Sequence, residues 1–208
     1  SYHALARICF YEDEMEKALE YIYKGLDKFE QDGEKEHIYH FLLVSKIIYL
    51  EGLNRDEEAL IAVEDLWANR NNIDSREVIL SIYEIKTRLL TKLTRFEDAI
   101  ALAYEGLTTA RINRMYDHAG YLWMALGECY NKQKKFQNAE ICFQSAINMR
   151  THLRNKSFVI RMFIKIGKLY QQVLSIQKAS EMFTMAIQLA RKNPKKNLLS
   201  ESLESMGD

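Results

Sequence analysis

Five alanines recur at an almost constant interval along this 208-residue chain. They stand 41, 40, 40 and 40 residues apart, at Ala18, Ala59, Ala99, Ala139 and Ala179. Twelve residues before each alanine lies a second column, which holds glycine at Gly127 and Gly167. Self-similarity at a fixed period of about 20–50 residues is the signature of proteins built from stacked repeats. The chain is therefore predicted to be a repeat protein.

Each period divides into two helical patterns joined by a short polar turn. Apolar residues at helical spacing predict one pair of helices at 118–132 and 136–150, and another at 157–173 and 176–192. Ser75 and Thr94 are each expected to cap the helix that follows, because a hydroxyl there accepts a bond from a free backbone N–H. With one proline and no alternating β-branched runs, the chain is predicted to be all-α.

Nothing in the interior of the sequence suggests a domain boundary. No linker or low-complexity segment interrupts the pattern, so a single domain is expected over residues 1–208. Its repeats are predicted at 1–33, 34–73, 74–113, 114–153 and 154–193, with a partial repeat at 194–208. Because both ends of the sequence fall inside a repeat, we expect it to be a fragment of a longer protein.

Composition predicts a cytoplasmic protein that makes no contact with membranes. Lys and Arg number 29, as do Asp and Glu, so no net charge favours nucleic acid or an anionic membrane. Cys9, Cys129 and Cys142 lack the spacing of a metal site and are expected to be reduced and buried. No apolar run approaches the length of about 18 residues that suggests a membrane-spanning helix.

Patterns that indicate chemistry are weak. His37 and His40 lie three residues apart with Glu34 and Glu36 nearby, a set that could hold a metal ion. A histidine pair on a surface helix is more often solvated. The sequence contains no Gly-rich phosphate loop, nucleophile elbow or HExxH motif. We therefore predict that the chain is not an enzyme and binds neither a cofactor nor a metal.

The repeat columns resemble those of the tetratricopeptide repeat. That family carries a large residue, Leu-Gly, Tyr, Ala and Ala in this order, and the fourth repeat matches with Trp123, Leu126, Gly127, Tyr130, Ala139 and Ala146. The second and third repeats depart, because Lys46 and Lys86 replace the leucine while Ile47 and Thr87 replace the glycine. The period is also longer than the usual length of about 34 residues. The resemblance implies an α-solenoid, a right-handed superhelix of antiparallel helix hairpins.

The resemblance also implies where a ligand binds. In this family the first helices of the hairpins line the concave face of the superhelix. The corresponding residues are Phe41, Val44, Ser45, Ser81, Glu84, Arg88, Tyr121, Met124, Glu128, Arg161, Lys165 and Lys168. This face is expected to be apolar at the second repeat, mixed at the third and fourth, and basic at the fifth. The expected ligand is a short peptide or an extended protein segment.

Three basic residues on the fifth repeat have two open interpretations. Arg161, Lys165 and Lys168 share one face of a predicted helix and have no acidic partner on that face. They form either a solvated basic stripe or a site for a carboxylate of an extended peptide. In the second case Arg161 would bind the carboxylate with two parallel hydrogen bonds, and the ligand would be acidic.

Two classes of the family differ in how well they match. Chaperone adaptors hold acidic C-terminal tails with a clamp of Lys, Asn and Arg, but Glu84 replaces the first lysine and would repel a carboxylate. The long period instead resembles the C-terminal domain of Gram-positive cytosolic receptors for signalling peptides, the Rap, PlcR and NprR type. That resemblance implies a quorum-sensing transcription regulator. Most members control an N-terminal helix-turn-helix domain, so DNA would be contacted only through a domain absent from this chain.

One departure keeps an alternative open. The asparagines that hold the peptide backbone in those receptors are missing, and Ser45, Ile85, Ala125 and Lys165 stand in that column. The alternative is a generic scaffold or adaptor for the assembly of protein complexes. In either case we expect a homodimer, because an open end of a solenoid exposes apolar surface.

Overall fold

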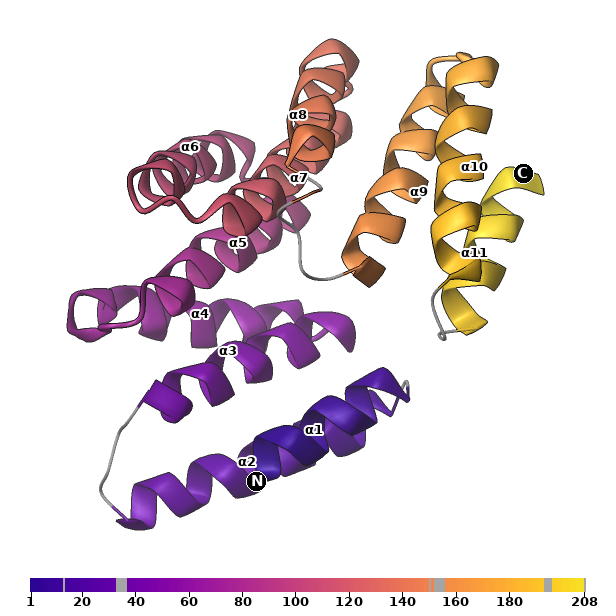
Figure 1. The fold of residues 1–208 in the computed structure, drawn as a ribbon. Helices are drawn as coiled ribbons and strands as arrows, with labels where there is room; N and C mark the ends of the chain where they lie inside the picture. The colour runs from indigo at the N-terminus through magenta and orange to yellow at the C-terminus, as the bar shows by residue number, and fades with distance from the viewer. Residues whose placement is uncertain (13, 33–36, 150, 152–155, 193–195, 208) are drawn as a thin grey trace. The chain divides into compact units, whose positions relative to one another are not determined.

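Helices account for nearly all of the structure, a computed structural model that describes residues 1–12, 14–32, 37–149, 151, 156–192 and 196–207. These residues form eleven α-helices and one short 3₁₀ helix, with no strand among them (Figure 1). The prediction of an all-α chain of helix hairpins is confirmed. The chain divides into two compact units, Ser1–Asp98 and Ala99–Asp208.

The first unit is built from neighbouring helices that share one core. In chain order they are α1 (Tyr2–Tyr11), α2 (Met15–Asp32), α3 (His37–Gly52), α4 (Asp56–Ala68), the 3₁₀ helix η1 (Arg70–Asn72) and α5 (Arg76–Lys92). Each of these α-helices packs on the next, and α3 also packs on α5. Their apolar faces meet in one hydrophobic cluster, in which Ile22, Ile47 and Val63 are fully buried. The core is therefore distributed between successive helices.

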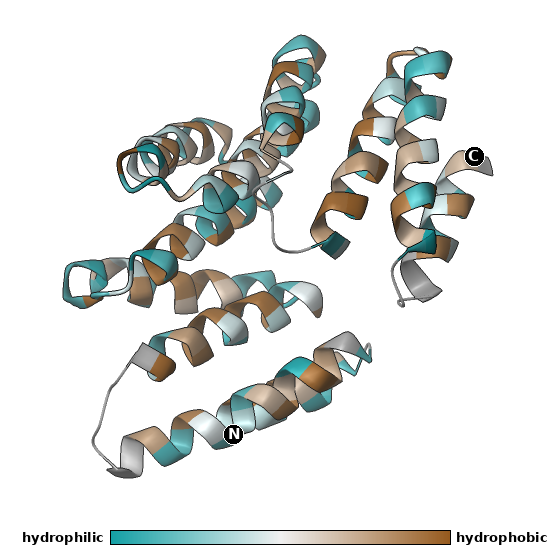
Figure 2. Ribbon diagram, in the orientation of Figure 1, coloured by the Kyte–Doolittle hydropathy of each residue, from teal (hydrophilic) through white to brown (hydrophobic). Residues whose placement is uncertain are grey.

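The second unit repeats this arrangement. Its helices are α6 (Phe96–Ile112), which begins at the end of the first unit, α7 (Tyr116–Lys132), α8 (Phe136–Asn148), α9 (Lys156–Gln172), α10 (Ile176–Arg191) and α11 (Lys196–Gly207). The helices of the pairs α7–α8 and α9–α10 pack together, α8 contacts α9, and α11 packs on α9 and α10. Figure 2 shows hydrophobic residues recurring along α9 and α10 between hydrophilic ones, as expected for helices buried on one side. All four predicted helices lie within two residues of the observed bounds.

Two glycines are required by close contact between the helices of a hairpin. A Cβ atom added at Gly127 would lie 2.4 Å from the ring of Phe143, and one at Gly167 would lie 2.4 Å from the ring of Phe183. In the α3–α4 hairpin Ile47 replaces the glycine, and the residue sixteen positions later is Val63 instead of phenylalanine. A larger residue in one column is therefore accompanied by a smaller one in the other.

Five of the turns between helices share one geometry. Each contains one residue with a φ angle between 56° and 60°, namely Asn54, Thr94, Arg114, Lys134 or Leu174. The next N–H bonds to a carbonyl oxygen five residues earlier, as in Lys135 N to Tyr130 O at 2.9 Å. This is the Schellman motif, which satisfies the last carbonyls of the preceding helix.

The two predicted caps have different outcomes. Ser75 accepts a hydrogen bond from Val78 N at 3.4 Å and caps α5, as predicted. The prediction for Thr94 is wrong, because its left-handed backbone ends α5 and α6 begins two residues later. Cys9, Cys129 and Cys142 are buried and form no disulfide with one another, as predicted. No helix within the described ranges has both the length and the hydropathy needed to cross a membrane.

Leu174 offers a direct test of the turn geometry. Its φ angle is 56° and its side chain is 83% exposed, so replacing it removes little packing. A left-handed conformation costs an L-residue about 1–2 kcal/mol, and glycine avoids this cost. Leu174→Gly should therefore raise the free energy of unfolding in urea by about 1 kcal/mol, whereas Val173→Gly next to it should lower it. A Leu174→Gly protein no more stable than the parent would contradict this interpretation.

Candidate peptide-binding faces

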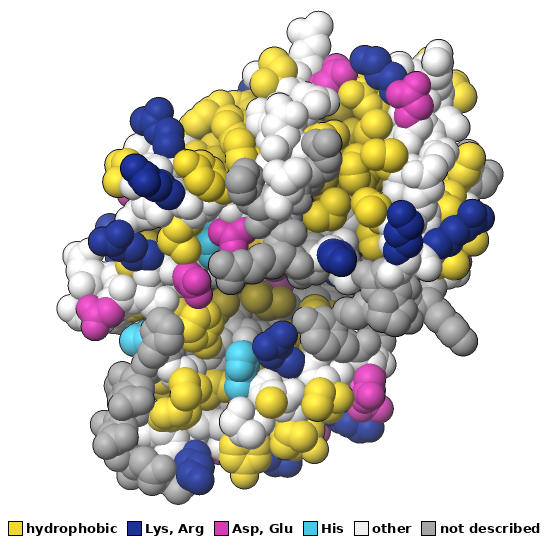
Figure 3. All heavy atoms as spheres, in the orientation of Figure 1, with side chains coloured by type: hydrophobic (Ala, Val, Ile, Leu, Met, Phe, Trp, Pro, Cys, Tyr) yellow, Lys and Arg dark blue, Asp and Glu magenta, His cyan; other side chains and the backbone are white. Residues whose placement is uncertain are grey.

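The twelve residues predicted to contact a ligand lie on the first helices of four hairpins, and they differ in exposure. Val44 and Met124 are only 6% and 2% exposed, because α3 and α7 turn them toward neighbouring helices. A ligand-contacting role does not fit this burial, so the prediction is corrected for both residues. On the face shown in Figure 3, charged side chains stand among hydrophobic ones. The other predicted residues are half-buried (Phe41, Ser45, Ser81, Glu84, Arg88, Tyr121 and Glu128) or exposed (Arg161, Lys165 and Lys168).

In the first unit the predicted charges are neutralised within the protein. Arg88 Nε and Nη2 donate to the two carboxylate oxygens of Glu51, at 3.2 and 2.6 Å, and Nη1 bonds to Glu84. Lys92 Nζ lies 2.8 Å from Asp56 and 3.8 Å from Glu51, which extends the cluster. The sequence did not predict the roles of Glu51, at the end of α3, and Asp56, at the start of α4. They lie 37 and 36 residues from their respective partners on α5, and no sequence pattern indicates such a pairing.

The uncharged polar groups of the same face are also engaged. Ser45 Oγ lies 3.3 Å from His3 Nε2, a hydrogen bond that joins α3 to α1. Burial lowers the pKa of His3, and the positive charge of Arg7 lowers it further. Ser81 Oγ donates to the Glu77 carbonyl at 2.9 Å. Phe41 packs against the hydrophobic cluster of the unit. This face therefore offers a ligand few groups that lack a protein partner.

In the second unit two contacts bring the predicted residues of α7 and α9 together. Glu128 on α7 pairs with Lys165 on α9. Tyr121 meets Phe158 edge to face, with ring centroids 4.4 Å apart and ring planes at 89°. Neighbouring first helices therefore lie side by side here, as the repeat pattern implies.

The charges of α9 are only partly neutralised. This helix contains four basic residues and no acidic one. We call Arg161, Lys165 and Lys168 the basic face of α9, and all three are exposed. Lys165 has Glu128 as its partner, whereas Arg161 and Lys168 form no ion pair with any residue that the structure describes. Two of the three cations of the basic face are therefore not neutralised by an ion pair within the described residues.

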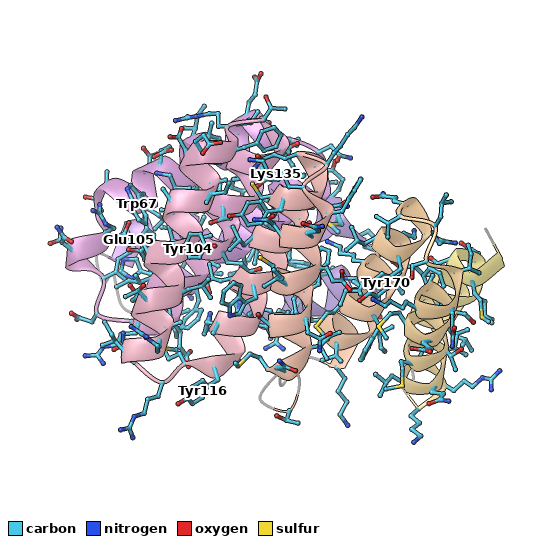
Figure 4. The ribbon with its side chains drawn as sticks, turned by 90° about the horizontal axis from the view of Figure 1, so that it is seen from above. Trp67, Tyr104, Glu105, Tyr116, Lys135 and Tyr170 are labelled. Carbon is cyan, nitrogen blue, oxygen red and sulfur yellow. The ribbon has the colours of Figure 1, made fainter. Side chains whose placement is uncertain are left out.

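A second polar cluster joins α9 to the helices α8 and α10. Tyr170, labelled in Figure 4, donates from its hydroxyl to Glu140 Oε1 on α8 at 2.9 Å. Lys178 on α10 donates to the same oxygen at 3.1 Å and lies over the Tyr170 ring. The bonds from Lys178 and Tyr170 lower the pKa of Glu140, while burial and then Glu140 raise the pKa of Tyr170 to about 12. The three side chains connect α8, α9 and α10.

The observed cavities do not coincide with the predicted face. Two cavities of the first unit, of about 720 and 430 Å³, are lined by none of the twelve residues. The pair His37 and His40 cannot be compared with the structure, because the His37 side chain lies outside the described residues. Over the described part of the chain, no group of three or more His, Cys, Asp or Glu side chains is placed to hold a metal ion.

Known proteins share the fold of this chain. A sequence model of the tetratricopeptide repeat matches residues 121–152, which lie within the predicted fourth repeat. No curated protein sequence matches the chain significantly. A Rap protein complexed with Competence and Sporulation Factor has a TM-score of 0.80 at 14% identity, and the match covers 99% of this chain and 62% of the Rap chain. A thermophilic TPR protein of Thermus thermophilus has a TM-score of 0.75 at 16% identity, over 100% of this chain and 98% of the other.

A third structure, BtubC from P. vanneervenii, has a TM-score of 0.71 at 14% identity, over 93% of this chain and 82% of that one. At these identities the likeness establishes the fold. Together with the repeat at 121–152, it confirms the resemblance to tetratricopeptide-repeat proteins that the columns predicted.

The ion cluster around Arg88 leads to a stability prediction. Arg88→Met leaves Glu51 and Glu84, both largely buried, without their guanidinium partner. Leaving a buried polar group unpaired costs about 1–3 kcal/mol, so the free energy of unfolding should fall by that amount. Adding Glu51→Gln should recover part of the loss in urea titrations. Lys17→Met, which breaks an exposed pair with Glu14, is the control and should change little. Equal losses for Arg88→Met and Lys17→Met would contradict the interpretation.

Proposed function

We propose that this chain is a binding module that holds an extended acidic peptide or protein segment against the basic face of α9. The observation that supports this is the difference between two predicted sites of positive charge. Arg88 is neutralised by Glu51 and Glu84, whereas Arg161 and Lys168 are exposed and form no ion pair with described residues. Carboxylates are the natural partners of such cations, because charge-assisted hydrogen bonds are the strongest that side chains make.

The spacing of the two cations indicates the pattern of the ligand. Arg161 and Lys168 are seven residues apart, which is two helical turns, or about 10.5 Å at 1.5 Å per residue. A peptide in the polyproline II conformation has three residues per turn and rises about 3.1 Å per residue, so acidic residues at i and i+3 lie on one side of it, about 9 Å apart. Tyr121, held by Phe158 on α9, lies on the neighbouring first helix and offers an aromatic surface for an apolar side chain. The ligand should therefore be extended, with two acidic residues three positions apart.

In its more specific form, the proposal makes the chain the regulatory domain of a bacterial cytosolic receptor for a signalling peptide. Two observations support it: the long repeat period, and the fold shared with a Rap protein that is complexed with Competence and Sporulation Factor. Peptide contacts would then change either the superhelical pitch of the repeats or the assembly of the chain into a homodimer. Any DNA contact would be made by a domain outside this chain.

A general assembly scaffold is the second candidate. It is favoured by the turn between α9 and α10, where Leu174 and Ile176 are 83% and 67% exposed. Exposed apolar clusters are typical of surfaces that contact other proteins. This candidate predicts that binding does not depend on acidic residues in the ligand. Comparing an acidic peptide with its uncharged counterpart therefore distinguishes the two candidates.

The test uses a fluorescently labelled, acetylated peptide, Ala-Glu-Ala-Ala-Glu-Ala, and its Gln-for-Glu counterpart. Arg161→Ala with Lys168→Ala should raise the Kd of the acidic peptide at least tenfold in fluorescence anisotropy. Lys165→Ala should have a smaller effect, because Lys165 already pairs with Glu128. Added salt should weaken binding, since exposed charges are screened.

The control removes the same charge elsewhere. Lys17→Ala with Lys24→Ala on α2 should leave the Kd unchanged, and circular dichroism should show full helicity for every variant. An unchanged Kd for the α9 double variant, or equal binding of the Gln peptide, would contradict the acidic-ligand proposal.

A further inference from the structure

The larger cavity of the first unit, of about 720 Å³, lies between α2, α3, α4 and η1. On α3 it is lined by Leu43, Lys46 and Leu50. At about 100° per residue, these positions lie on the opposite side of α3 from Phe41 and Ser45. The cavity is therefore distinct from the face considered for peptide binding. Its volume is within the range of small-ligand sites, about 300–1,000 Å³.

Lys46 is one of the two lysines that replace leucine in the repeat pattern. The other, Lys86, has both a carboxylate and an aromatic ring as neighbours. Lys86 Nζ donates to Glu64 Oε2 at 2.7 Å and lies 4.6 Å from the ring centroid of Trp67, a residue labelled in Figure 4. The position equivalent to Glu64 in the preceding repeat is Tyr23, 41 residues earlier. Lys46 Nζ lies over the Tyr23 ring at 5.3 Å and forms no ion pair with described residues. Lys46 therefore has the aromatic neighbour but lacks the carboxylate.

The acidic residues of the cavity do not supply that carboxylate. Glu58 lines the cavity, but both of its oxygens bond to Arg55, at 2.6 and 2.7 Å. Asp65 also lines the cavity and forms no ion pair with Lys46 or with any other residue in the described ranges. The hydrogen bond and the charge of Arg55 lower the pKa of Glu58, and the charge of Lys46 helps to lower it, but Lys46 forms no ion pair within the described ranges. The cavity thus combines a cation without a bonded carboxylate and a separate hydrogen-bond acceptor. A suitable ligand carries a carboxylate together with an N–H donor.

We propose that this cavity binds the carboxylate of an N-acylated amino acid, either as a free molecule or as the C-terminal residue of a peptide. The carboxylate pairs with Lys46 Nζ and takes the role that Glu64 has for Lys86. The amide N–H of the ligand faces Asp65. The side chain of the ligand packs on the apolar lining, which includes Tyr23 and Ile61. This site is independent of the basic face of α9.

The experiment is an NMR titration of the whole chain with N-acetyl-L-phenylalanine and with its amide, which lacks the charge. The acid should bind the parent protein, and the amide should bind at least tenfold more weakly. Lys46→Leu should weaken binding of the acid at least tenfold, and it should fold because it restores the leucine of the repeat pattern. Lys86→Leu is the matched control and should leave the Kd unchanged.

A second variant fills the site from within. Tyr23→Glu places a carboxylate where the next repeat has Glu64, so it should pair with Lys46 and abolish binding while the lysine remains. The peptide acetyl-Ala-Ala-Ala-Ala-Phe distinguishes the two sources of the ligand. If it binds more tightly than N-acetyl-L-phenylalanine, the ligand is the C-terminus of a peptide. If it binds equally or more weakly, the ligand is a free N-acylated amino acid. Absence of binding by both acids, equal binding of the amide, or full binding by Lys46→Leu would overturn the proposal.

Discussion

The fold depends on the close approach of two helices within each hairpin. Gly127 and Gly167 leave no room for a Cβ atom, because the rings of Phe143 and Phe183 occupy that space. Such contact brings the helix axes to the short end of the usual separation of about 8–10 Å. Each hairpin then buries its remaining apolar surface on its neighbours, which is how repeat proteins obtain their stability. Local pairing thus sets the architecture of each unit.

The same packing determines which charges a ligand can reach. Adjacent first helices lie near enough for Arg88 to reach Glu51 and for Lys165 to reach Glu128, so these charges are consumed within the protein. Arg161 lies on the same helix as Lys165 but forms no ion pair with any residue that the structure describes. The cluster of Tyr170 with Glu140 and Lys178 attaches α9 to α8 and α10. The basic face of α9 is therefore carried by a helix that is fixed on two sides, which lowers the cost of ordering it around a ligand.

The sequence predicted those features that repeat. The register of Ala139 and Ala179 and the bounds of the helices follow from periodicity, because the same helix packing recurs in each repeat. It did not predict features that arise once. Thr94 has the side chain of an N-cap but the backbone of a helix end, and only its φ angle distinguishes the two. Met124 was predicted to be accessible, although the rotation of α7 buries it.

The candidate sites were predictable to a smaller extent. The basic spacing of Arg161, Lys165 and Lys168 is visible in the sequence, but which of them has a partner depends on Glu128 of another helix. Lys46 was recognised as a departure from the repeat pattern. Its significance required the comparison with Lys86 and the cavity beside it, since a substituted column alone does not show which charge is left without a partner.

The most direct test of the packing account is a double-mutant cycle between Gly127 and Phe143, measured as free energies of unfolding in urea. Gly127→Ala overfills the contact and should cost about 1–3 kcal/mol. Phe143→Leu vacates the space that the new methyl group needs, so the double variant should be more stable than the sum of the single losses by about 0.5–3 kcal/mol. Losses that add to within about 0.5 kcal/mol would contradict the claim that these two columns hold the hairpin together.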